Sequence, residues 1–221
     1  MIIERGISFD EIHSFHDLNL ILSGSEIKPA EAKTTYVDIA GGDGSADLTE
    51  ANGEVRYKDR TLKFTFTMNP QDDLSDDAWE EKKTEISNIL NGKCFMITRD
   101  VDPDYYYQGR CTVDDFKSDK RIRQFVVSAK VRPYKLKHLH TVVPVELTEE
   151  PKTIILSNGR KSVVPWIECT EDNTHILFEN AEYATSKGKK QILDICLKYG
   201  DNIVTVSGSG KITFSYQEGD L

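Results

Sequence analysis

Residues 37–67 read VDIAGGDGSADLTEANGEVRYKDRTLKFTFT and hold the signals that decide the fold. The stretch ends in a run in which Leu62, Phe64 and Phe66 alternate with Thr and Lys side chains. Successive side chains of a strand point to opposite faces of a sheet, so this period of two predicts a half-buried strand. Upstream, the glycines within residues 41–44 give the backbone the freedom for a sharp turn. The stretch therefore predicts a turn and then a strand.

Further runs with the same alternation lie downstream. They occupy residues 124–131, 193–197 and 212–216, and apolar side chains recur there at every second position. Nine Tyr and nine Phe residues, with many Val, Ile and Thr, add to the strand-forming character of the chain. We therefore expect a mostly β protein of the α+β class.

One segment, from Asp76 to Leu90, breaks the alternation. Its apolar residues recur near helical spacing and are Trp79, Ile86, Ile89 and Leu90. Asp76 and Asp77 can cap the start of a helix, where the helix dipole favours acidic groups. The Asn91-Gly92 pair supplies a left-handed stop. We expect one helix here, placed against the sheet between two strands.

A domain boundary is predicted between Pro133 and Pro144. The strand that ends at Arg132 runs into Pro133, and Pro144 and Pro151 follow a polar, basic stretch. Proline cannot donate to a sheet or continue a helix, so regular structure is interrupted there. Short strands separated by turn signals come next, which is typical of a small sandwich or barrel. We therefore expect two domains, residues 1–137 and 138–221.

The composition excludes several classes of protein. The 221 residues include 37 acidic and 28 basic side chains, and the formal net charge is −9. Nucleic-acid binders usually have a net basic domain, so the charge argues against that partner. The apolar runs are too short for a transmembrane helix. The N-terminus has no signal-peptide pattern, so we expect a protein made and kept in a cytoplasm until it is assembled.

The cysteines are widely spaced and form no C-x-x-C pair. They are Cys94, Cys111, Cys169 and Cys196. All four have apolar or strand-like neighbours, which favours buried reduced thiols over disulfides or a metal site.

Two fragments resemble ligand-binding loops but lack essential residues. The Gly208–Lys211 sequence is similar to a phosphate-binding loop, yet Thr205 and Ile212 occupy places that need Gly and Ser or Thr. We interpret it as a hairpin turn. The Asp100–Asp104 stretch is similar to the start of a calcium loop, yet Tyr105 stands where an EF-hand needs Gly. Solvated turn carboxylates are the default there, and a calcium site made from loops stays an alternative.

The candidate general bases are histidines, and none lies in a nucleophile or metal signature. They are His13, His16, His138, His140 and His175. His138 and His140 could share one side of a strand, but no third metal ligand is visible. We therefore expect surface or linker histidines and no catalytic, cofactor-binding or metal-binding residue.

A basic cluster lies just before the strand predicted at residues 124–131. Its members are Lys117, Lys120, Arg121 and Arg123. Such a cluster is typical of a solvated hairpin end. In an oligomer it could instead meet the acidic stretch at residues 72–85.

Five motifs follow one another in a fixed order along residues 42–66. They are Gly42–Gly44, Asp47–Glu50, Tyr57, Asp59-Arg60 and Leu62–Phe66. This order resembles the N-terminal region of the distal tail proteins of siphophages and of prophages of Gram-positive bacteria. The exit from the domain at residues 131–135 fits as well. Arg60 beside Asp59 could form a charge-assisted bond that fixes the turn.

The C-terminal part is similar to the second domain of the same family. The matching places are Ser157–Gly159, Val164-Pro165, Tyr199–Asn202 and Gly208–Tyr216. The resemblance implies an N-terminal β-sandwich or split-barrel-like domain with one helix, followed by a galectin-like β-sandwich.

The resemblance also implies a structural role. It implies a hexameric ring at the tail tip of the virion, formed by the N-terminal domains with the C-terminal domains pointing outward. The ring would join the major tail tube protein to a tail-associated lysin, a tail fibre or a receptor-binding protein. Genomic DNA would pass through it without specific binding, and neither a membrane nor a cofactor would be involved.

Two rival functions remain open. One is a carbohydrate-binding protein that recognises the host wall, for which Trp166 with nearby Glu168 is the candidate aromatic platform. The apolar neighbours Val164, Pro165 and Ile167 favour a core position for Trp166 instead. The other rival is a tail-tip hydrolase, and the missing nucleophile signature counts against it.

Overall fold

The structure is a computed structural model that describes residues 5–51, 53–119 and 122–221. The chain divides into two compact units, Met1–Pro133 and Tyr134–Leu221. The boundary predicted after residue 137 falls at the end of a short strand of the second unit. Each unit has a core of its own. The described chain is mostly β, as the alternation of its sequence predicts.

The first unit is built on a sheet whose described strands run in the order β2-β1-β7-β8-β9-β6-β3. Their bounds are β1 Ile7–Phe9, β2 Ile12–His13, β3 Leu20–Ile27, β6 Arg60–Met68, β7 Cys94–Arg99, β8 Asp102–Asp119 and β9 Ile122–Val131. Every pairing between them is antiparallel. A Cβ at Gly109 of β8 would lie 2.1 Å from the carbonyl oxygen of Lys130 on β9. Only glycine therefore lets these two strands pair at that point.

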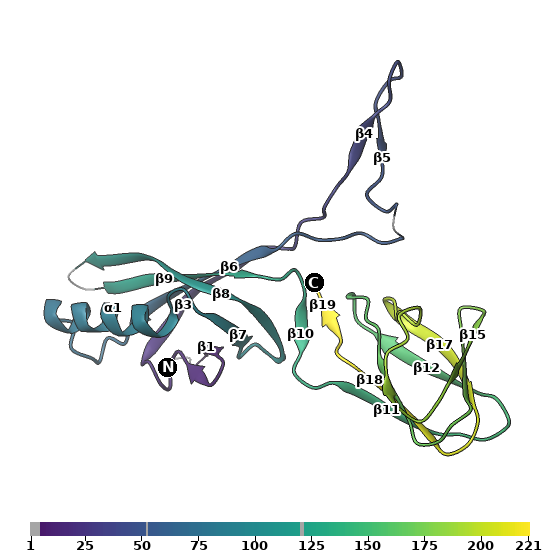
Figure 1. Cartoon of the computed structure of the whole chain (residues 1–221). Helices are drawn as coiled ribbons and strands as arrows, with labels where there is room; N and C mark the ends of the chain where they lie inside the picture. The colour runs from purple at the N-terminus through teal and green to yellow at the C-terminus, as the bar shows by residue number, and fades with distance from the viewer. Residues whose placement is uncertain (1–4, 52, 120–121) are drawn as a thin grey trace. The chain divides into compact units, whose positions relative to one another are not determined.

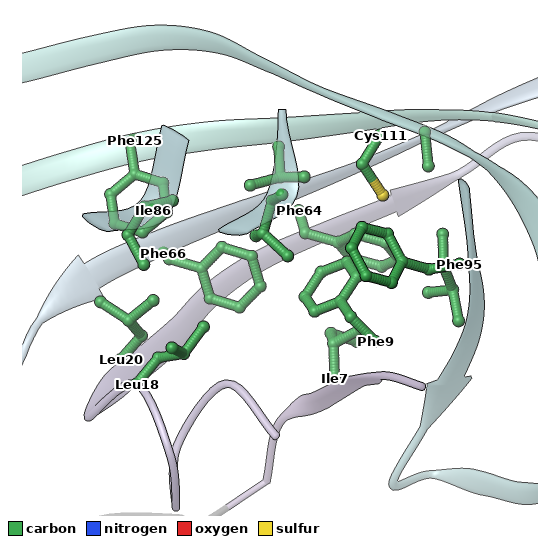
Figure 2. Packing of buried hydrophobic residues seen from close by; sticks show 14 of the residues in the cluster. Ile7, Phe9, Leu18, Leu20, Phe64, Phe66, Ile86, Phe95, Cys111 and Phe125 are labelled. Carbon is green, nitrogen blue, oxygen red and sulfur yellow. The ribbon is translucent and has the colours of Figure 1, made fainter. Parts of the chain in front are cut away.

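One face of this sheet is buried. On β6 the side chains of Leu62, Phe64 and Phe66 are fully buried, and the Thr and Lys residues between them face outward. Figure 2 shows Phe9, Phe66 and Phe95 packing together, with ring centroids 6.4 Å apart for Phe9–Phe66 and 5.9 Å for Phe9–Phe95. The alternation in the sequence thus becomes the inner and outer faces of one sheet.

Helix α1, Asp76–Leu90, covers the buried face. Its bounds are those predicted, and Trp79, Ile86 and Leu90 are buried as expected. The capping prediction was wrong, because Ser75 is the N-cap and its hydroxyl accepts the hydrogen bond of Ala78 N at 3.3 Å. Asp76 and Asp77 occupy the first turn instead. The predicted stop is confirmed, since Gly92 has φ +76°.

The second unit is a β-sandwich of two sheets with a short extra strand pair. One sheet has the order β11-β18-β13-β16 and the other β12-β17-β14-β15. The bounds of the first are β11 Thr141–Glu146, β18 Lys211–Tyr216, β13 Trp166–Cys169 and β16 Gly188–Lys190. Those of the second are β12 Lys152–Asn158, β17 Gly200–Ser207, β14 Thr174–Phe178 and β15 Ala181–Thr185. The extra pair is β10 Lys135–Lys137 with β19 Gly219–Asp220.

Buried residues of both sheets share one core. Ile167 and Phe214 enter it from the first sheet, and Leu156 and Val204 enter it from the second. Two faces that bury their apolar side chains against each other define a sandwich.

Two predictions for this unit were wrong. Residues 191–198 form a loop with a single bridge, Val163 to Leu197, and Leu193 is exposed although Ile195 and Leu197 are buried. The glycine-rich segment 208–210 is not a hairpin turn, because β17 and β18 belong to different sheets. It carries the chain from one sheet to the other. Gly208 at φ +136° and Gly210 at φ +78° give the backbone that path.

The cysteine prediction was correct for two residues. Cys111 and Cys169 are buried, Cys196 is partly buried and Cys94 is exposed. All four are free thiols. No α-helix in the described part of the chain is long and apolar enough to cross a membrane.

Candidate functional site

Residues 28–59 leave the main sheet after β3 and return to it at β6, and we call them the arm. Its middle is a hairpin of β4, Tyr36–Asp38, and β5, Ser45–Asp47. Figure 1 shows this hairpin standing clear of the sheet of its own unit. Closer to the sheet the two sides of the arm are joined by backbone bonds, Lys33 N to Arg56 O at 2.7 Å and Lys58 N to Glu31 O at 2.8 Å. The arm is therefore an extended two-stranded ribbon.

The arm exposes large apolar side chains. Tyr36 is 61% exposed and Ile39 54%, and Val37 and Leu48 are nearly as open. None of these residues belongs to the core cluster of the unit. A two-stranded hairpin that buries no apolar surface is marginally stable in water. The arm therefore presents an apolar surface that the core of its own unit does not cover.

The glycines of the tip and the Asp47–Thr49 segment shape this ribbon. Gly41 and Gly44, at φ +75° and +77°, let the chain turn at the tip. At the end of β5 the carboxylate of Asp47 accepts the hydrogen bond of Thr49 N at 2.9 Å. Hydrogen bonds from Thr49 lower the pKa of Asp47 below its usual value. The turn predicted at residues 41–44 is thus present.

Arg60 lies at the base of the arm. The predicted bond between Arg60 and Asp59 is not present. The Arg60 guanidinium lies over the ring of Tyr107, 4.9 Å from the centroid, and donates to the carbonyl of Lys28 at 3.4 Å. Asp59 is exposed. The Arg60 side chain is buried, and burial lowers its pKa. Within the described chain Nε and Nη2 of Arg60 have no hydrogen-bond partner.

Of the predicted basic cluster, the structure describes Lys117 and Arg123, and these two differ in exposure. Arg123 is buried and binds Asp76 at 2.5 Å and the carbonyl of Leu74 at 3.1 Å. Its guanidinium also lies 5.8 Å from the ring centroid of Trp79. The expectation of a solvated end was therefore wrong for Arg123, which ties β9 to the start of α1. Lys117 is exposed, and Lys120 and Arg121 lie outside the described residues.

The first of the candidate histidines, His13, pairs with an acidic side chain. His13 Nε2 lies 3.1 Å from Asp100 Oδ2, and its Nδ1 accepts the backbone hydrogen bonds of Phe15 and His16. Asp100 also accepts from Gly6 N at 2.6 Å, so this carboxylate anchors the first strand. Both imidazole nitrogens of His13 are thus engaged in holding a turn.

Among the other candidate histidines, His16 stacks on the ring of His13, with ring centroids 4.5 Å apart. His175 is paired with Glu182 at 3.0 Å on the outer face of the second sheet of the sandwich. His138 and His140 lie beyond the end of β10 and share no strand. Among the residues that the structure describes, no three His, Cys, Asp or Glu side chains come together as a metal site would need.

Trp166 contradicts the prediction of a core position. It is 45% exposed at the start of β13, and the neighbours Pro165 and Ile167 are buried. Alternation places Trp166 on the outer face, because both of its neighbours point inward.

One comparison with a solved structure supports the fold. No family model matches the chain, and no curated protein matches its sequence. The crystal structure of the Dit (gp 19.1) protein of phage SPP1, described as a paradigm of the hub adsorption apparatus in phages that infect Gram-positive bacteria, is similar over 96% of this chain and 98% of that one. The identity is 13% and the TM-score 0.68.

A chain of the phage P2 baseplate in its activated conformation with Ca also aligns, over 98% of each chain at 7% identity. Its TM-score of 0.40 is too low to carry an argument. The resemblance to distal tail proteins is thus confirmed as a likeness of fold.

Proposed function

We propose that this chain is a structural protein of a phage tail, which assembles into a ring hub of six copies at the tail tip. The fold that it shares with the SPP1 Dit protein supports the proposal. The ring would join the tail tube protein on one side to a lysin, fibre or receptor-binding protein on the other. The first unit would form the ring, and the second would point outward.

The exposed arm is the observation that carries this proposal. Its apolar side chains have no core of their own, and a second copy of the chain is the partner that the ring supplies. A contact between two different surfaces of identical chains repeats head to tail and closes into a ring when the rotation allows. The arm of one copy would thus lie on the first unit of the next.

The charge of the chain suits a channel through which DNA passes. With 37 acidic and 28 basic side chains, the wall of the ring would be neutral or acidic. Basic walls hold phosphates by releasing counterions, and that attraction would slow passage. The proposed role is geometric, with no reaction and no cofactor, and its place is the virion.

The test is the mass and the electron-microscope image of the purified full chain. We expect rings, and we expect Ile39→Ser with Leu48→Ser to shift the population toward single chains. The matched control is Leu193→Ser, which alters an apolar residue that is more exposed than either and lies in the second unit. A chain that stays single at every concentration contradicts the ring. Rings that form equally well with the altered arm would contradict the role of the arm.

A further inference from the structure

The outer face of the sheet β11-β18-β13-β16 presents Trp166 among polar side chains. Directly across the sheet from Trp166 lie Ser215 on β18 and then Val142 on β11. The next row on the same face consists of Pro144, Thr213, Glu168 and Lys189. All of these side chains are exposed or partly exposed. One aromatic ring therefore borders a row of hydroxyl, carboxylate and ammonium groups.

Lys189 defines one side of this platform. Its Nζ lies 5.5 Å from the centroid of the Trp166 ring, and its strand position is directly opposite Glu168. A cation at this distance from an indole is attracted by the negative face of the ring. Beside this contact Trp166 is still 45% exposed.

The polar setting distinguishes this face from a protein interface. The central residue of a protein interface is usually surrounded by neighbours that exclude water. Around Trp166 the neighbours carry hydrogen-bonding groups, and Val142 is the one large apolar residue in its row. A pyranose matches such a surface, because its axial C–H groups form an apolar face and its rim carries hydroxyls that both donate and accept.

The spacing and the charge narrow the ligand class. Facing residues of paired strands are about 5 Å apart and diagonal ones about 7–8 Å, so an oligosaccharide stacked on Trp166 is within reach of the hydroxyls of both Ser215 and Thr213. The next row adds Glu146 opposite Lys211. The two carboxylates of this face thus balance its two ammonium groups, which favours a neutral ligand.

We propose that Trp166, Glu168, Lys189, Thr213 and Ser215 form a binding site for neutral pyranose oligosaccharides. A sugar ring stacks on Trp166, Glu168 accepts from its hydroxyls, and Lys189 donates to them. The site lies within the second unit and does not depend on the proposed ring.

Tryptophan fluorescence of the full chain tests this site directly. The chain has two tryptophans, and Trp79 is buried, so acrylamide quenching reports mainly on Trp166. We expect maltotriose, cellotriose or chitotriose to protect Trp166 from the quencher in a saturable way. Glycan binding measured by calorimetry should weaken at least tenfold in Trp166→Ala, and should weaken in Glu168→Gln and Thr213→Val.

Tyr199→Ala is the matched control. Tyr199 is another exposed aromatic of the second unit with a cation over its ring, Arg160 at 5.6 Å, but it lies in the turn before β17. Binding should be unchanged in this variant. The proposal is wrong if none of the three sugars protects Trp166, or if Tyr199→Ala weakens binding as much as Trp166→Ala. It is also wrong if only an anionic polymer such as poly(glycerol phosphate) binds, or if Trp166 becomes protected by raising the protein concentration alone.

Discussion

Helix α1 and the arm both belong to the first unit and both carry large apolar side chains, but they use them in opposite ways. Trp79, Ile86 and Leu90 of α1 are buried against the sheet. Tyr36 and Ile39 of the arm face solvent and touch no core cluster. The helix thus stabilises the single chain, whereas these side chains of the arm contribute nothing to the core of their unit. Variants of the helix should therefore change the free energy of unfolding, and variants of the arm should leave it nearly unchanged.

The largest effect is expected from Trp79→Ala. Trp79 is 4% exposed and its ring packs edge-on against Phe116 at 5.9 Å. Removing a buried Trp side chain typically costs about 3–5 kcal/mol of unfolding free energy. Denaturant unfolding measures it, and Trp166→Ala is the control, because an exposed site changes stability by about 0.5 kcal/mol or less. If both variants lost the same unfolding free energy, the buried position of Trp79 would be contradicted.

A smaller effect is expected at the start of the helix. Ser75→Ala removes the side-chain acceptor of the Ala78 N–H and should lower the unfolding free energy by about 1 kcal/mol. Ser75→Thr keeps the hydroxyl that accepts from Ala78 N and donates to Asp73, and should retain most of the stability. A Ser75→Ala chain as stable as the parent would show that Asp76 and Asp77 cap the helix after all.

The arm should contribute little to the stability of the single chain. Ile39→Ser with Leu48→Ser alters exposed side chains, so the unfolding free energy should change by about 0.5 kcal/mol or less under conditions where the chain is monomeric. Thermal unfolding at low protein concentration checks this. A loss comparable to that of Trp79→Ala would mean that the arm packs on its own unit.

Thiol labelling compares burial without altering the chain. Burial raises the pKa of Cys111 to about 12, so this residue stays a protonated thiol at mildly alkaline pH. Cys94 on the neighbouring strand is exposed. Reaction with a disulfide reagent should modify Cys94 quickly and Cys111 only after denaturation, as peptide mapping would show. Rapid modification of Cys111 in the native chain would contradict the packing of β8 against the core.

The sequence predicts α1 well because its signals are local. The helical spacing from Trp79 to Leu90 and the glycine at 92 lie within the segment itself. The cap was missed although Ser75 is a common N-cap residue three positions before the N–H that it accepts. Asp76 and Asp77, the predicted cap, lie in the first turn of the helix.

Alternation predicts burial better than it predicts pairing. Ile195 and Leu197 are buried as a strand would bury them, yet their backbone forms a loop held mainly by the Val163–Leu197 bridge. At Trp166 the same alternation places the indole outside, but the apolar neighbours were interpreted as a core instead. The partners of Arg60 and Arg123 come from distant strands and a helix, so no local pattern reveals them.

The exposure of the apolar residues in the arm was not predicted from the sequence. Val37 and Leu48 are of residue types that are common in protein cores. They are exposed to solvent here because the hairpin stands clear of the sheet. A glycine-rich tip between two short apolar segments is the signal that could have suggested it.

The strand order of the two sheets, in which β17 and β18 pair with earlier strands, limits when the sandwich can fold during synthesis. Strand β18 pairs with both β11 and β13, and the partners Thr141 and Tyr216 are 75 positions apart. Strand β12 likewise pairs with β17, which is synthesised much later. The early strands therefore leave the ribosome without their neighbours and remain open until β17 and β18 emerge. Non-local pairing of this kind folds slowly, so the second unit should be the last part to become native and the part most dependent on chaperones.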